Sequence, residues 1–268
     1  MKRGLPSLVL TLHHTPARWS LSATATGIPG LRRLFQNLLL EGYRFASLEA
    51  HGPAGLPQGA ISVTVDDGYE SNARHLAPLL RELRIPWTVF VLEGSLGRQN
   101  GWDLRLAGPR ERHLTEDDIR ALAGEGVTIG AHAVTHRDLR LLDDVALEEE
   151  LAGSRTRLRR LCGQEVALVS YPRGRVDARV ARAAERAGFR SGFCGARPPR
   201  LDTDLSRFAI ARTALYSPDQ VPGVFTRTAL RPPRHLASIR PALAGLGDAL
   251  TVAGLKVSGL KVQGGRHV

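Results

Sequence analysis

Residues 60–68 read Ala-Ile-Ser-Val-Thr-Val-Asp-Asp-Gly, and this stretch gives the strongest indication of the fold. Its first six residues, Ala60–Val65, are mostly apolar and β-branched, as is typical of a buried strand in a parallel sheet. Asp66 and Asp67 follow this strand directly. Adjacent carboxylates repel each other, and a divalent cation bound by one of them would offset that cost. An Asp-Asp-Gly turn is the alternative interpretation, because these residue types are common in turns.

Short apolar runs alternate with helical patterns on both sides of this strand, which predicts a mainly parallel sheet with crossover helices. The predicted strands are 8–12, 45–48, 60–65, 88–92, 127–129, 166–170, 191–194 and 208–215. The predicted helices are 28–40, 69–83, 115–126, 143–161 and 178–187, the third of which starts at a capping box formed by Thr115 and Asp118. This order predicts an α/β fold, a distorted (β/α) barrel with about seven strands; a doubly wound open sheet is the alternative.

Charge and composition give little support for a nucleic-acid-binding, membrane-spanning or disulfide-rich protein. The chain has 268 residues and a formal net charge of +11, but nearly all of its 37 basic residues are Arg, so the charge alone is weak evidence for nucleic-acid binding. No apolar run is long enough to span a bilayer, and we recognise no signal peptide, which favours a cytoplasmic location, including the inner membrane face. Two cysteines are too few for a disulfide framework.

The C-terminal part differs from the rest. Residues 231–268 contain six Arg or Lys and a single acidic residue. We expect residues 1–216 to form the barrel domain and residues 217–268 a basic extension that packs on it or is partly disordered. Peripheral membrane contact through this extension is a further expectation.

Two other segments follow predicted strands, at the strand ends where α/β folds build their sites. His132 and His136 are spaced i, i+4, so both imidazoles can reach one ion. Residues 171–174, Tyr-Pro-Arg-Gly, follow the next strand. One Asp and two His with open positions is the ligand count of a catalytic metal site, which increases the supply of hydroxide near neutral pH.

Taken together, the three segments resemble the polysaccharide deacetylase family, also called the NodB homology domain or carbohydrate esterase family 4. The matching stretches are Thr64–Gly68, His132–His136 and Ser170–Gly174, in the order and at the distances typical of the family. The resemblance covers residues 8–215 and implies a NodB-like barrel. It also implies hydrolysis of an N-acetyl group on an amino sugar.

The resemblance assigns a role to each matching residue. It implies that Asp67, His132 and His136 bind one divalent metal, usually Zn²⁺, with Co²⁺, Ni²⁺ or Mn²⁺ as alternatives. It makes Asp66 the general base and the backbone N–H of Arg173 an oxyanion donor. The candidate substrate-binding residues are Tyr171, Pro172 and Trp102.

Several positions depart from the family pattern. Ala133 stands where Ser or Thr usually supports the metal-binding loop, which predicts weaker support of that loop. Ser170 stands where one branch of the family has an Arg that braces the catalytic Asp, and Arg212 is the candidate replacement. The late Leu-x-His motif that carries the general acid is missing after Leu215. His13 and His235 are the remaining candidates for the acid.

Other charged residues are expected to be structural. We expect His75 and His113 to be exposed beside helices. We expect Glu148–Glu150 to pair with Arg155–Arg160 on a solvated helix face, with no specific nucleic-acid partner.

The leading hypothesis is a metal-dependent deacetylase acting on an N-acetylated polymer, oligosaccharide or glycolipid. One alternative keeps the fold and metal but hydrolyses a formamide, an imide or a non-sugar acetamide. The other is a non-catalytic carbohydrate-binding relative.

Overall fold

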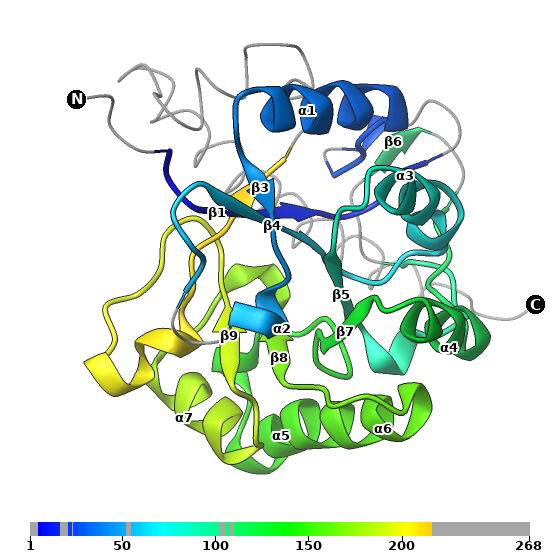
Figure 1. The fold of residues 1–268 in the computed structure, drawn as a ribbon. Helices are drawn as coiled ribbons and strands as arrows, with labels where there is room; N and C mark the ends of the chain where they lie inside the picture. Colours follow the sequence, from blue (N-terminus) through cyan, green and yellow to red (C-terminus); the bar gives the residue numbers. More distant parts are fainter. Residues whose placement is uncertain are drawn as a thin grey trace, which may run out of the picture.

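Seven parallel strands curl around a common axis and form a half-barrel (Figure 1). This computed structural model describes residues 5–16, 21–22, 24–51, 55–101, 105–107 and 110–215. The strand order is β10 (Thr213–Ala214), β1 (Leu8–Leu12), β4 (Ala60–Val65), β5 (Trp87–Val91), β7 (Thr128–Ala131), β8 (Leu168–Ser170) and β9 (Ser191–Phe193). A short strand, β3 (Arg44–Phe45), also pairs with β4. The predicted (β/α) barrel is therefore confirmed, with seven strands along its path.

The barrel is not fully closed between its first and last strands. Among the described residues, an isolated parallel bridge between Phe193 and Ile210 connects the end of β9 to the segment before β10. A separate two-stranded antiparallel sheet pairs β2 (Leu21–Ser22) with β6 (Arg105–Ala107). The predicted extension 217–268 lies outside the described residues.

Helices surround the outside of the strands (Figure 1). They are α1 (Ile28–Leu40), α2 (Leu48–His51), α3 (Ala77–Glu82), α4 (Glu116–Gly124), α5 (Asp144–Glu148), α6 (Ser154–Cys162) and α7 (Ala178–Arg186). π-Helical turns at Asn72–Leu76 and Glu149–Gly153 precede α3 and join α5 to α6. Short 3₁₀ turns occupy 93–95, 139–141, 172–174 and 203–208. Within the described ranges, no helix is both long and apolar enough to cross a membrane.

The side chains of β5 alternate between two buried hydrophobic clusters, one on each face of the sheet. Val89 and Val91 of β5 belong to the main core, which packs beneath the helices. Phe90 between them belongs to a second cluster with Leu168 and Phe193. Because successive side chains of a strand point to opposite faces, this second cluster fills the inside of the barrel. A Cβ at Gly130 would lie 2.5 Å from the Phe90 ring, so the neighbouring strand needs glycine there.

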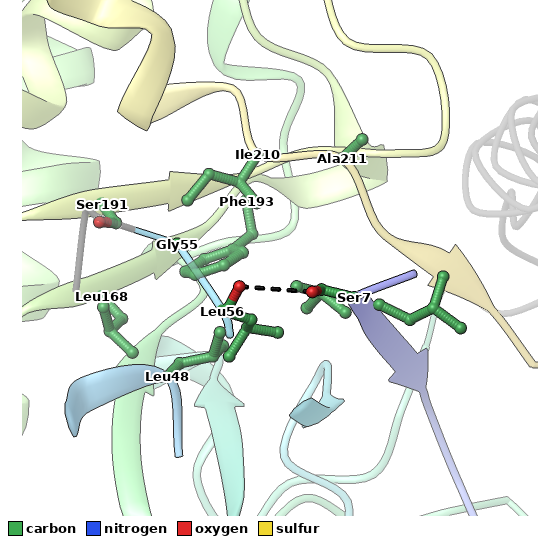
Figure 2. A pocket seen from close by; sticks show the side chains of 11 residues that line it. Ser7, Leu48, Gly55, Leu56, Leu168, Ser191, Phe193, Ile210 and Ala211 are labelled. Atoms are coloured by element: carbon green, nitrogen blue, oxygen red, sulfur yellow. Dashed lines mark hydrogen bonds between the residues drawn. The ribbon is translucent and has the colours of Figure 1, made fainter. Parts of the chain in front are cut away.

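The inside of the barrel also holds a pocket of about 220 Å³ (Figure 2). Leu56, Leu168, Phe193 and Ile210 line much of it, and Ser7 Oγ donates to the Leu56 carbonyl at 3.3 Å across its edge. The pocket borders the first residues of β1, β8 and β9. It therefore lies at the end of the barrel away from the strand ends that carry the Asp and His motifs.

Four predicted elements differ from the structure. The predicted helix 69–83 is a π-helical turn over Asn72–Leu76 followed by the shorter α3. The predicted strand 45–48 stops at Phe45, because Ser47 Oγ accepts a hydrogen bond from Glu49 N at 3.2 Å and starts α2. The predicted strand 208–215 is reduced to β10, since a 3₁₀ turn runs to Phe208. The predicted helix 143–161 is divided by its π-helical turn.

Candidate metal centre and catalytic site

The backbone ladder of the sheet continues one residue past the strands that carry the motifs. Asp66 N donates to Leu12 O at 2.9 Å, and His132 N donates to Val91 O at 2.8 Å. The parallel register therefore fixes the first residue of each motif at the same end of the barrel. Asp67 then adopts a left-handed conformation with φ 67°, which ends the strand and turns its side chain away from that of Asp66.

Asp67, His132 and His136 form a compact cluster. Their candidate ligand atoms all lie within 4.8 Å of one another. Asp67 Oδ1 is 3.3 Å from His132 Nε2 and 3.5 Å from His136 Nε2. Asp67 and His132 are each 2% exposed, so the cluster is largely shielded from solvent. The structure thus brings together the three ligands that the sequence predicted.

The donor set fits a divalent cation. Among the described residues, Asp67 Oδ1 is buried and accepts no hydrogen bond, although two imidazole nitrogens lie close to it. His132 Nδ1 is 2.8 Å from the Ser170 carbonyl oxygen, which orients the ring so that Nε2 faces Asp67. Histidine ligands of metals commonly bind a carbonyl through their other nitrogen in this way. One carboxylate oxygen and two imidazole nitrogens suit Zn²⁺ and leave positions open.

The ionisation of the cluster also suits metal binding. Burial would raise the pKa of Asp67, but the close contact with His132 and the charges of His136 and His132 hold it well below its usual range. Burial lowers the pKa of His136 to about 4, with the Asp67 charge opposing and the His132 charge assisting. At neutral pH Asp67 therefore offers a carboxylate and His136 a neutral imidazole, the forms that bind metal. Burial would lower the pKa of His132, but the charges of Asp66 and Asp67 raise it, so metal binding would have to displace a proton from His132 wherever that ring is protonated.

Arg212, the residue before β10, holds Asp66 through a bidentate contact. Its Nη1 and Nη2 donate to the two Asp66 carboxylate oxygens at 2.8 and 2.7 Å. Nη2 also donates to Ser170 Oγ at 2.8 Å, and Nη1 to Thr64 Oγ1 at 3.2 Å. The guanidinium carbon lies 5.6 Å from the centre of the Phe90 ring. Arg212 is therefore placed as the predicted brace of Asp66, with Ser170 accepting a further bond from it.

Asp66 is buried but ionised. Burial would raise its pKa, yet the charge of Arg212, then that of His132, and the hydrogen bonds from Arg212 lower the pKa below its ordinary value. Asp66 and Arg212 are 5% and 4% exposed, respectively. A bidentate pair of this kind fixes the direction of the carboxylate as well as its charge.

The turn at 172–174 lies after β8. Arg173 has φ 62° and Gly174 has φ 65°, and a Cβ at Gly174 would lie 2.7 Å from Gly195 N. Hydrogen bonds from the N–H groups of Gly174 and Arg175 close the turn, so the Arg173 N–H is not used to close it. Pro172 is buried at the start of the turn.

Tyr171 lies beneath this turn, inside the protein. Its side chain is 0% exposed, and a Cβ at Gly192 would lie 2.2 Å from the Tyr171 hydroxyl oxygen. In this structure Tyr171 therefore packs under the turn and presents no open surface. Burial raises the pKa of its hydroxyl far above the ordinary value.

The remaining candidate site residues are His13, Trp102 and His235. His13 is half-buried just after β1, where its carbonyl accepts from Asn72 Nδ2 at 2.7 Å. Leu12 pairs with Val65 in the parallel register of β1 and β4, so His13 follows β1 beside Asp66, which follows β4. Trp102 and His235 lie outside the described residues.

His113 was expected to be exposed, and that expectation is wrong. It is 1% exposed, its Nδ1 lies 2.8 Å from the Asp67 carbonyl oxygen, and its ring stacks on Tyr69 with centroids 4.8 Å apart. Asn100 Nδ2 in turn donates to the Tyr69 hydroxyl at 2.7 Å. These residues support the turn at Asp67. No local pattern predicts this support, because the partners come from distant loops.

Comparison with known proteins agrees with this geometry. A family model described as polysaccharide deacetylase matches residues 54–192, slightly more than half of the chain. The family protein YxkH of Bacillus subtilis is 27% identical over 152 residues, which cover 57% of this chain and 50% of YxkH. The chain thus spans about half the length of that curated relative.

Two solved structures share the fold. IcaB from Ammonifex degensii superposes with a TM-score of 0.65 at 21% identity, covering 81% of this chain and 95% of that one. A de-N-acetylase from Aggregatibacter actinomycetemcomitans superposes with a TM-score of 0.67 at 18% identity, covering 83% and 98%. At these identities the likeness shows the fold alone, and the family follows from the family model together with the motifs. The chain belongs to the polysaccharide deacetylase family, a family of hydrolases that act on non-peptide carbon–nitrogen bonds.

Proposed function

We propose that this protein is a metal-dependent deacetylase that removes the N-acetyl group of an amino sugar in a polymer, oligosaccharide or glycolipid. The observation that carries the proposal is the convergence of two arrangements. Asp67, His132 and His136 form a buried donor set, and Asp66 lies beside them in a bidentate pair with Arg212. Metal ligands next to an independently held carboxylate are what hydrolysis of an amide by activated water requires.

The residues divide the chemistry between them. Asp67, His132 and His136 would hold Zn²⁺, or Co²⁺, Ni²⁺ or Mn²⁺, which polarises a carbonyl and lowers the pKa of water. Asp66 accepts the proton of the attacking water, while Arg212 keeps its carboxylate ionised and directed. The N–H of Arg173 is the proposed donor to the negative oxygen that develops on the amide.

His13 is the proposed proton donor to the leaving amine, because the register of β1 and β4 places it beside Asp66 and it is the acid candidate that lies within the described residues. His13→Gln should lower kcat by about 10²- to 10⁴-fold. It should not change the metal content. His75→Gln, a half-buried histidine that bonds the Thr15 carbonyl, is the matched control. Wild-type kcat in His13→Gln would show that another group supplies the proton.

A substrate panel tests the proposed reaction. Zinc-loaded protein is incubated with N-acetylglucosamine oligomers, an N-acetylated glycolipid, a formamide and a cyclic imide, and the products are measured. We expect acetate and a free amine from the N-acetyl sugars. Formate release or ring opening without acetate would instead identify the alternative carbon–nitrogen hydrolase. Stoichiometric zinc with no hydrolysis of any substrate would favour a carbohydrate-binding relative.

A further inference from the structure

The loop between the two candidate histidine ligands depends on a residue that none of the motifs contains. Ala133 in this loop has φ 66°, so the chain leaves β7 in a left-handed conformation. The N–H groups of Val134 and Thr135 then both point to Glu150, whose Oε2 accepts from each of them at 2.8 Å. The Thr135 hydroxyl donates to the other carboxylate oxygen, Oε1. One carboxylate thus satisfies three donors from two successive loop residues.

The opposite side of the loop is also tied down. Glu93 N donates to the Ala133 carbonyl at 3.2 Å, and Gly94 N donates to the Val134 carbonyl at 2.9 Å. A Cβ at Gly94 would lie 2.6 Å from that Val134 oxygen, so the approach requires glycine. The loop is therefore held between two backbone N–H groups on one side and the Glu150 carboxylate on the other.

Glu150 differs from its neighbours along the helix. Glu149 pairs with Arg157 at 2.8 Å, as expected for the solvated face. Glu150, which was expected to lie on the same face, is 5% exposed, and that expectation is wrong. Among the residues that the structure describes, Glu150 forms no ion pair. Within these residues its carboxylate accepts the three loop donors, and hydrogen bonds to an ionised acceptor are about twice as strong as neutral ones.

The π-helical turn explains why Glu150 points inward. The turn covers Glu149–Gly153 and adds a residue to the helix, which changes the direction of the side chains within it. Ser154 is fully buried, and its hydroxyl donates to the carbonyls of Glu150 and Leu151 at 2.7 and 3.0 Å. These bonds occupy carbonyl groups in the widened turn and stabilise it.

We propose that Glu150 is a positioning residue that holds the loop between His132 and His136 in the conformation that binds metal. The proposal rests on the metal site of the proposed function and adds to it the residue on which ligand geometry depends. It also accounts for Ala133: the support that a Ser or Thr there would give comes instead from Glu150 and Thr135. Removing the carboxylate leaves the N–H groups of Val134 and Thr135 without this acceptor and allows His136 to move relative to Asp67.

The test is the metal affinity of the purified full-length chain, measured with Zn²⁺ by chelator competition and with Co²⁺ by visible absorption. Glu150→Ala should weaken Zn²⁺ binding by about 10- to 100-fold, the usual effect of losing a residue that orients metal ligands. It should also change the Co²⁺ absorption bands at saturation. Glu150→Gln should bind within about tenfold of wild type and keep the Co²⁺ bands. Its amide oxygen can accept both N–H groups, while Thr135 Oγ1 accepts from its amide nitrogen.

The controls separate positioning from folding. Glu149→Gln removes the adjacent exposed carboxylate and should leave metal affinity unchanged. Each variant is measured below the unfolding temperature of its metal-free form. If Glu150→Ala does not fold, Thr135→Val, which removes the hydroxyl donor, should still weaken binding several-fold.

The possible results distinguish the role of Glu150 from the proposed metal-dependent function. Wild-type affinity and unchanged Co²⁺ bands in Glu150→Ala would overturn the role of Glu150. If Glu150→Ala does not fold, wild-type affinity in Thr135→Val would do the same. A wild-type chain that binds neither Zn²⁺ nor Co²⁺ would instead contradict the proposed function.

Discussion

Replacing Asp66 with Asn should abolish acetate release while the metal remains bound. The carboxylate of Asp66 lies beside the candidate ligands without being one of them, and its two oxygens are directed by Arg212. An amide at this position cannot accept a proton from water near neutral pH. We therefore expect kcat to fall by about 10²- to 10⁴-fold, with about one equivalent of zinc retained.

This variant also leaves the Arg212 guanidinium with a weaker partner, so its stability must be known before its activity is interpreted. Acetate release is therefore measured below the unfolding temperature of Asp66→Asn. Asp118→Asn, in the capping box of α4, is the matched control and should keep wild-type activity. Wild-type turnover by folded Asp66→Asn would show that Asp66 is not the base.

Arg212→Met should impair both stability and catalysis. It removes four side-chain hydrogen bonds and the charge that keeps Asp66 ionised. Breaking a buried ion pair by deleting one partner typically costs about 3–5 kcal/mol, because the remaining charge is buried without compensation. The pKa of Asp66 should rise in the variant, since burial is then opposed by less charge. The acid limb of the pH–rate profile should therefore move to higher pH.

The stability difference should depend on pH with a defined sign. The pKa of Asp66 in the folded wild type is below its unfolded value, so its contribution is present above about pH 4 and is lost as the pH falls through the folded pKa. In Arg212→Met this contribution disappears. The difference in free energy of unfolding between the two proteins should therefore increase from about pH 3 to about pH 7.

Urea unfolding at several pH values measures this dependence. Arg212→Lys keeps one positive charge but cannot form the bidentate contact, so it should lie between the wild type and Arg212→Met. Arg207→Met, which removes a surface pair with Glu185, is the control. A pH-independent stability difference together with an unmoved acid limb would contradict the role given to Arg212.

The elements with strong local signals could be predicted from the sequence. β1, α1 and β4 have the predicted bounds, because an apolar β-branched run and an i, i+3, i+4 pattern are local properties. The capping box at Thr115 is confirmed for the same reason: both partners lie within three residues. The division of helix 143–161 was missed, because a π-helical turn depends on tertiary contacts and has no periodic signature.

The residues of the candidate site also differ in how far local sequence patterns could predict them. Asp66, Asp67, His132 and His136 could be found because Asp66 and His132 directly follow strands whose parallel register brings them together, Asp67 is adjacent to Asp66, and His136 is spaced i+4 from His132. The contacts of Arg212 and Glu150 span 146 residues and 15 to 16 residues, respectively. Spacing alone cannot pair such positions. Arg212 was a candidate only because a bracing arginine was missing at Ser170, whereas Glu150 resembled its solvent-facing neighbours.

The most direct test of the account is acetate release from N-acetylglucosamine oligomers by the same protein sample before chelation, after chelation and after zinc is added back. We expect chelation to remove turnover and one equivalent of Zn²⁺ to restore it. In Asp67→Asn, which keeps both histidines, added Zn²⁺ should not restore turnover. Undiminished acetate release by protein shown to contain no metal would contradict the account.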